Sequence, residues 1–176
     1  SPMMLIFPLM MLFGLLGMVN PQDNKGDIDE TRRVYLRHLD ALASKARSNA
    51  ARQREHATAL HPAPADLVAA TPVERVWERT ASSSMALTVR LGTGTGALCT
   101  PVEVDDPGSP EDLDPVCAVS LRRTVAAVST VPGMPIVVQL DAFPAVTLAG
   151  PGALDVARSI VAQLAFFHGP ELVHVD

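Results

Sequence analysis

Apolar residues are distributed along this chain in three different ways. Residues 3–19, MMLIFPLMMLFGLLGMV, contain no charge and no strongly polar side chain. Residues 27–60 are rich in charged side chains, carry apolar positions at helical spacing and contain no glycine or proline. Beyond them the pattern breaks into short runs separated by proline, glycine and acidic residues. The three patterns predict three segments, 1–22, 23–61 and 62–176.

The first segment is long enough to cross a bilayer as a helix. At ~1.5 Å per residue, residues 3–19 reach roughly 26 Å, near the lower limit for a membrane span. A signal peptide would carry a basic start and a small-residue cleavage site, and neither is visible. A buried helix of a globular domain would show a polar stripe, which this segment lacks. The pattern predicts a transmembrane helix in residues 1–22, with the chain that follows it in the cytoplasm.

The second segment predicts one long helix over residues 27–60. Asp27 and Glu30 have the spacing of a capping box, and acidic side chains suit the first turn of a helix. A heptad stripe, which becomes polar toward its end, comprises Ile28, Tyr35, Leu39, Leu42, Ala46, Asn49, Gln53 and Leu60. Such a helix is either a solvated surface helix of a globular domain or a stalk. Its length and its position after a membrane span favour a stalk over residues 23–61.

The third segment, 62–176, predicts an α/β domain. Two helices are expected, over 115–130 and 152–169, and the first has Asp114 as its N-cap. Five strands are expected, at 86–91, 97–104, 135–140, 145–150 and 171–175. Gly92 to Gly96, GTGTG, lies between the first two strands and is expected to be a hairpin turn. The order of strand, glycine loop, helix and strand near the C-terminal end indicates a parallel βαβ unit.

The glycine loop in TLAGPGALDVARSIVAQL is laid out like the phosphate-binding loops of nucleotide hydrolases. Counted from Gly150, the pattern G-x-x-x-x-G-K-[ST] has Asp155, Val156 and Ala157 at its glycine, lysine and hydroxyl positions. The lysine would supply positive charge to the terminal phosphates, whereas Asp155 would repel them. We therefore predict a degenerate phosphate loop without nucleotide chemistry, at Gly150, Gly152, Asp155, Val156 and Ala157.

No other set of residues predicts catalysis or metal binding. The formal net charge of −5 argues against a nucleic-acid partner, and the histidines lack metal-site spacing. Cys99 and Cys117 are expected to be small buried side chains in a reducing compartment. His168 is expected to cap a helix C-terminus. Trp77, the single tryptophan, is either a packing anchor at a domain boundary or an anchor for a partner.

Several stretches, in order along nearly the whole chain, resemble the N-terminal part of one protein family. They are LMMLFGLLGMV (9–19), DIDETRRVYLRHLDALA (27–43), RQREHATALHPAPADL (52–67), VWER (76–79), VRLGTG (89–94), LDPV (113–116), VPGMPIVVQL (131–140) and VAQLAFFHGPELVHV (161–175). The family is the EccC-type membrane ATPases of type VII secretion systems, a branch of the FtsK/SpoIIIE motors. One departure is SSSMAL, where the family usually has an aspartate-phenylalanine pair.

The resemblance implies an α+β fold with a transmembrane helix, in which a long helical stalk leads to a truncated α/β domain. That domain would resemble a degenerate FtsK-like ATPase domain. The implied function is the anchor and stalk of a secretion motor, coupling cytoplasmic ATPase modules to the inner-membrane export channel. The alternative is a self-contained, membrane-tethered adaptor without nucleotide chemistry.

The resemblance also implies a location and partners. The location is the inner (plasma) membrane of an actinobacterium, in six copies, with the bulk of the chain facing the cytoplasm. The partners would be other copies of the chain, EccB-, EccD- and EccE-type subunits, the lipid bilayer and small helical-hairpin substrates handled by later domains. ATP and magnesium are implied for the full-length parent, and no cofactor, metal or catalytic residue is expected in this segment.

Overall fold

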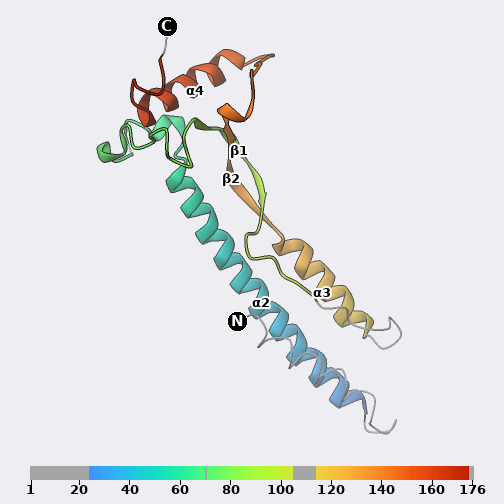
Figure 1. Ribbon diagram of the computed structural model, residues 1–176. Helices are drawn as coiled ribbons and strands as arrows, with labels where there is room; N and C mark the ends of the chain where they lie inside the picture. The colour runs from blue at the N-terminus through green and yellow to red at the C-terminus, as the bar shows by residue number, and fades with distance from the viewer. Residues whose placement is uncertain (1–23, 70, 105–113, 175–176) are drawn as a thin grey trace. The chain divides into compact units, whose positions relative to one another are not determined.

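The computed structural model describes residues 24–69, 71–104 and 114–174 (Figure 1). These ranges contain the helices α2 (Asn24–Leu60), α3 (Pro115–Val128) and α4 (Ala153–Phe167), and the strands β1 (Thr88–Ala97) and β2 (Thr130–Gln139). Short 3-10 helices lie at Pro64–Asp66, Val73–Arg75 and Leu140–Ala142. The chain divides into unit 1, with residues up to 50 and 98–130, and unit 2, with residues 51–97 and 131–176.

The predicted fold class, an α+β protein with a transmembrane helix and a partial α/β domain, is wrong for the chain that the structure describes. Among the described residues, no helix is both long enough and apolar enough to span a membrane. The longest, α2, carries charged side chains along most of its length, which a bilayer would not accept. The predicted span itself, residues 1–22, lies outside the described residues.

The sheet also differs from the predicted parallel βαβ unit. In the described ranges it has two strands, β1 and β2, drawn side by side in Figure 1. The strands are antiparallel, because the Leu98 N–H donates to Ser129 O at one end and the Leu140 N–H donates to Leu87 O at the other. The segments 97–104 and 145–150 were predicted as strands and lie almost wholly outside both.

The predicted hairpin turn at Gly92 to Gly96 is wrong, because all five residues lie inside β1. The connection from β1 to β2 instead contains α3. The glycines make room for side chains of the neighbouring strand. A Cβ at Gly94 would lie 2.8 Å from Ile136 Cδ1, and one at Gly96 would lie 3.2 Å from Met134 Cγ. Glycine in a strand often marks such a close approach.

Unit 1 is built where the N-terminal part of α2 packs against α3. Tyr35, Leu39 and Cys117 form its buried cluster, with Leu36 and Leu121 packed against them. The buried positions on α2 are Tyr35, Leu39, Ala43 and Ala46. Tyr35, Leu39 and Ala46 belong to the predicted stripe, whose other members are only half-buried, and Ala43 was not predicted. A spacing of three and four residues places these side chains on one helix face.

The start of α3 follows the prediction. Asp114 is its N-cap, and its Oδ1 accepts from the Val116 and Cys117 N–H groups at 3.0 Å each. Arg32 of α2 donates to Asp114 through Nε at 2.8 Å, which joins the two helices. Partial burial would raise the pKa of the Asp114 carboxyl, but the hydrogen bonds from Arg32 and Cys117 lower it overall.

Unit 2 combines the end of α2 with β1, β2 and α4, which packs on β1. Val89, Val131 and Phe167 are its most deeply buried apolar side chains. Gln163 of α4 joins the helix to the strand. Its amide accepts from the Arg90 N–H and donates to the Arg90 carbonyl, at 2.8 Å each, as a neighbouring strand would. This pairing satisfies a backbone position of β1 that β2 leaves open.

Candidate functional site: an arginine cap at the end of α2

The C-terminal end of α2 has no cap of its own. The last turn contains no basic residue, and His61 and Pro62 follow Leu60 where a glycine commonly ends a helix. The last carbonyl groups of a helix have no partner within it, and they carry the negative end of the helix dipole. The carbonyls near Leu60 therefore need donors from elsewhere in the chain.

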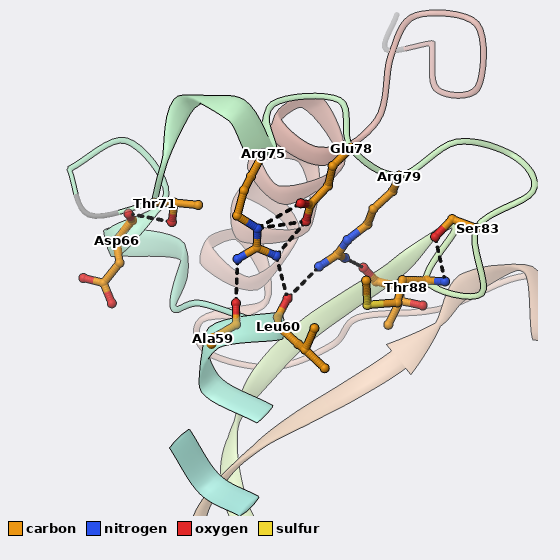
Figure 2. Close-up of polar contacts among 10 residues, drawn as sticks. Ala59, Leu60, Asp66, Thr71, Arg75, Glu78, Arg79, Ser83 and Thr88 are labelled. Carbon is orange, nitrogen blue, oxygen red and sulfur yellow. Dashed lines mark hydrogen bonds and ion pairs between the residues drawn. The ribbon is translucent and has the colours of Figure 1, made fainter. Parts of the chain in front are cut away.

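Three arginine side chains supply those donors to three consecutive carbonyls. Arg75 donates to Ala59 O and, at 3.2 Å, to Leu60 O. Arg79 donates to Leu60 O through Nη2 at 2.9 Å, as Figure 2 shows. Arg90 donates to His61 O through Nη1 at 2.9 Å. We refer to the three side chains Arg75, Arg79 and Arg90 as the arginine cap.

Arg79 is the central member, because it contacts three elements at once. Its side chain is only 1% exposed. Beyond Leu60 O of α2, its Nη1 donates to Thr88 O of β1 at 2.7 Å. Its guanidinium carbon lies 3.9 Å from the ring centroid of Phe167 in α4, a cation–π arrangement. Burial lowers the pKa of Arg79, yet a guanidinium stays charged in proteins.

Only one member of the cap has a carboxylate partner among the described residues. Arg75 Nε lies 3.0 Å from both carboxylate oxygens of Glu78, and its Nη2 donates to one of them at 2.6 Å. Arg79 and Arg90 make no ion pair in the described part of the chain. Their hydrogen bonds go to backbone carbonyls of β1 and of the end of α2, which carries negative partial charge, and the Glu78 carboxylate interacts favourably with Arg79 without an ion pair.

The histidine inside this cationic environment is kept neutral. Burial is the main cause and the positive charges of Arg79, Arg75 and Arg90 act in the same direction, so that together they lower the pKa of His61 to about 4. A protonated His61 would add a fourth positive charge to the cluster.

The C-terminal end of α4 holds the segment that carries the cap. The Trp77 and Arg79 N–H groups donate to Phe166 O and Phe167 O, at 2.9 Å each. The indole Nε1 of Trp77 donates to Ala165 O at 3.3 Å. Trp77 has φ +60°, a left-handed conformation that is rare for a bulky residue. Trp77 is 55% exposed, so most of its ring is not packed. The expected anchoring role therefore applies only to the hydrogen bond of its indole N–H.

His168 lies at the C-cap of α4, as predicted, but as a neutral ring. Its Nε2 accepts from the Leu87 N–H at 2.9 Å, so the proton must lie on Nδ1, which is 3.1 Å from Leu164 O. Burial lowers the pKa of His168 and Arg79 adds to this effect, while the bond to Leu164 O opposes it. The ring therefore acts through hydrogen bonds and not through charge at the helix dipole.

In the structure, the residues of the predicted phosphate loop form the junction between a loop and the start of α4. Gly150 and Gly152 have left-handed φ angles of +96° and +85°, and Gly152 is the N-cap of α4. Asp155, Val156 and Ala157 lie in the first turns of that helix. Asp155 forms an ion pair with Arg158, three residues later, at 3.3 Å. The strand expected before the loop is not formed, and the loop's lack of nucleotide binding stays a prediction.

The arginine cap was not predicted from the sequence. The signal available was the uncapped helix end before Pro62, which requires donors, but nothing local shows that Arg79 or Arg90 provides them. The prediction for the cysteines is half right, because Cys117 is buried and Cys99 is exposed.

Comparison with known proteins places the chain beside secretion components. No protein-family model matches it. It is 33% identical over 174 residues to the ESX secretion system protein EccC of Thermomonospora curvata, with 97% of this chain and 13% of the relative covered. It is 30% identical over 180 residues to the ESX-3 secretion system protein EccC3 of Mycobacterium tuberculosis, with 99% of this chain and 14% of the relative covered.

A third relative is the ESX-1 secretion system protein EccCa1 of Mycobacterium tuberculosis, 27% identical over 164 residues, with 85% of this chain and 21% of the relative covered. The chain thus spans between 13% and 21% of the length of these three relatives. The family resemblance of the sequence motifs is confirmed. Over nearly its whole length, the chain is a homologue of the EccC proteins of ESX type VII secretion systems and corresponds to a small part of each.

Proposed function

We propose that this chain is a structural segment of an EccC-type protein in type VII secretion, and that α2 is its stalk helix. The homology to EccC proteins supports the secretion role. The observation that carries the stalk role is the arginine cap, because it fastens the end of α2 to β1 and α4 through buried contacts of Arg79.

The cap gives α2 a mechanical connection to the elements that follow it. A displacement of Leu60 along the helix axis pulls on Arg75 and Arg79, whose donors hold its carbonyl. Arg79 passes the displacement to Thr88 of β1 and to the Phe167 ring. A helix that ended in solvent would instead fray under the same load. The cap therefore suits α2 to pass motion into the α4–β1 core.

We assign no nucleotide chemistry to this segment. The loop before α4 offers no lysine, and the Asp155 carboxylate in the first turn would repel a phosphate. ATP and magnesium are proposed for other parts of the parent protein. Other copies of the chain and EccB-, EccD- and EccE-type subunits are the proposed partners.

The proposal is tested in the parent protein by export of ESX substrates into the culture medium. We expect Arg79→Met to lower export several-fold at unchanged protein abundance, because the variant keeps the volume of the side chain and removes its donors. The matched control is Arg158→Met, which alters an exposed arginine of α4. Export by the Arg79 variant at the level of the Arg158 variant would refute the coupling role.

If abundance of the Arg79→Met protein falls, Arg75→Met provides the second test, since Arg75 is partly exposed and lies outside the deepest core. Normal export by that variant, at normal abundance, would also count against the coupling role.

A further inference from the structure

We propose that the C-terminal end of α2 supplies negative charge to Arg79 and Arg90, the two buried arginines of the cap, so that the last turn of α2 and the α4–β1 core unfold together. The inference concerns a conformational device in the fold and does not depend on a role in secretion. It rests on the burial of the arginines and on the nature of their acceptors.

Two buried guanidinium groups face carbonyl groups in place of carboxylates. Arg79 and Arg90 are 1% and 8% exposed. Side-chain donors of Arg79 go to Leu60 O and Thr88 O, and those of Arg90 go to His61 O and Gly92 O. Each arginine therefore has one acceptor at the end of α2 and one in β1 or directly at its start.

The acceptors at the end of α2 cannot be replaced locally. Arg79 Nε is already buried and has no hydrogen-bond partner in the described part of the chain. If the last turn of α2 frays, Leu60 O leaves and a second donor of the same buried cation is left unpaired. Burying an uncompensated charge is among the most unfavourable events in a protein interior. Fraying of α2 is therefore opposed by the desolvation energy of Arg79.

The same cation also contributes to packing on α4. The Phe167 ring, 1% exposed, lies under Arg79 at 3.9 Å and beside Arg75 at 5.3 Å. The Arg79 N–H donates to Phe167 O. A change in the position of Arg79 thus alters the environment of α4 at its C-terminal end. Through the arginine cap, fraying at the end of α2 should therefore change the environment at the C-terminal end of α4.

Trp77 provides a natural reporter of this coupling, because it is the single tryptophan and its indole N–H binds Ala165 O at the end of α4. Its fluorescence follows unfolding of the α4–β1 core, whereas circular dichroism at 222 nm follows total helix. The test compares Ala59→Gly with Ala41→Gly in the 176-residue chain. Both alanines are exposed on α2, but only Ala59 lies in its last turn.

We expect Ala59→Gly to lower the Trp77 midpoint of thermal unfolding by about 3 °C or more, because a shift of that size accompanies a modest loss of stability in a chain of this length. Ala41→Gly should reduce the helix signal and leave the Trp77 midpoint within about 1 °C, since Ala41 belongs to unit 1. Equal shifts in the two variants, or no shift for Ala59→Gly, would overturn the proposal.

A double-mutant cycle shows whether the arginines carry the effect. In an Arg75→Met background, the shift caused by Ala59→Gly should shrink to half or less, because Arg75 binds the Ala59 carbonyl. The matched background is Arg33→Met, an exposed arginine of α2 that binds Glu30 in the same helix. An undiminished shift in the Arg75 background would show that the coupling does not pass through the cap.

Discussion

The Arg79 guanidinium binds the carbonyl of Leu60, the last residue of α2, at 2.9 Å while its side chain is 1% exposed. A charge at this depth normally has a carboxylate beside it. Here no carboxylate forms an ion pair with Arg79 among the described residues, and the end of a helix and the face of an aromatic ring contact it instead, with Glu78 acting electrostatically. The pair explains why α2 can end at a His-Pro sequence without a glycine or a basic residue of its own.

Arg79→Lys tests the geometry of this contact. Lysine keeps the charge, but its single ammonium group cannot reproduce the planar donors that reach Leu60 O and Thr88 O together. We expect a loss of ~2–4 kcal/mol in the free energy of unfolding, measured by urea denaturation with Trp77 fluorescence. The control Arg158→Lys changes an exposed pair with Asp155 and should stay within ~0.5 kcal/mol. A similar loss in both variants would contradict the assignment.

Gln163→Leu tests the joint between α4 and β1. The substitution keeps the approximate volume but leaves the Arg90 N–H and carbonyl without their partner at a buried position. We expect a loss of ~2–4 kcal/mol and faster hydrogen exchange at the Arg90 amide. The exposed Gln139, which binds Asp141, provides the control as Gln139→Leu. Unchanged protection of the Arg90 amide would show that the side-chain pairing is not needed.

The neutral histidines predict a pH dependence of stability. The folded-state pKa values of His61, about 4, and His168 lie below the unfolded value, mainly because of burial. A depressed histidine pKa means that the unfolded state binds protons first, so stability is complete above about pH 6.5 and falls as the pH drops toward 4.

We expect thermal midpoints to fall between pH 7.5 and 5, and His168→Gln to reduce that fall. Glutamine keeps an acceptor near the Leu87 N–H and cannot be protonated. The control variant is His56→Gln, the same substitution at an exposed histidine of α2. The same slope in wild type and the His168 variant would exclude this residue as a source of the pH dependence.

The helices were largely predictable from the sequence, because their signals are local. The helix expected over 27–60 is found at Asn24–Leu60, and those expected over 115–130 and 152–169 are found at Pro115–Val128 and Ala153–Phe167. Helical periodicity, Asp114 before Pro115 and the glycines before α4 all act within a few residues. The start of α2 precedes Asp27, so the expected capping box does not define it.

The strands and the arginine cap were less predictable, because they depend on distant partners. The alternation in 145–150 suits a strand, but no neighbouring strand in the described ranges pairs with it. The glycines of β1 suggested a turn because the sequence does not show that Ile136 and Met134 will cover them. Arg90 and His61, which are joined by a hydrogen bond from the Arg90 side chain to the His61 carbonyl, lie 29 residues apart in the sequence. Such pairings arise only in the folded chain.

The contact of Gly94 with Ile136 gives a final prediction about the β1–β2 pair. A Cβ at position 94 would lie 2.8 Å from Ile136 Cδ1, a distance that forces one side chain to move. We therefore expect Gly94→Ala to cost ~1 kcal/mol or less, because Cδ1 is the far end of the exposed Ile136 side chain and can turn away. Gly92, also in β1, has no atom within 4 Å of a Cβ, so Gly92→Ala should be neutral or slightly stabilising.

Rescue separates this clash from a general loss of glycine. Ile136→Val removes the Cδ1 atom at 2.8 Å and keeps Cγ1 at 3.0 Å, so the double variant with Gly94→Ala should recover part of the lost stability in urea unfolding. Additive losses in the double variant would mean that the glycine is required for the backbone of β1 and not for the side chain of Ile136. Because Ile136 is 41% exposed, Ile136→Val alone should cost well below ~1 kcal/mol in the free energy of unfolding. The stability of the double variant can therefore be compared directly with that of Gly94→Ala.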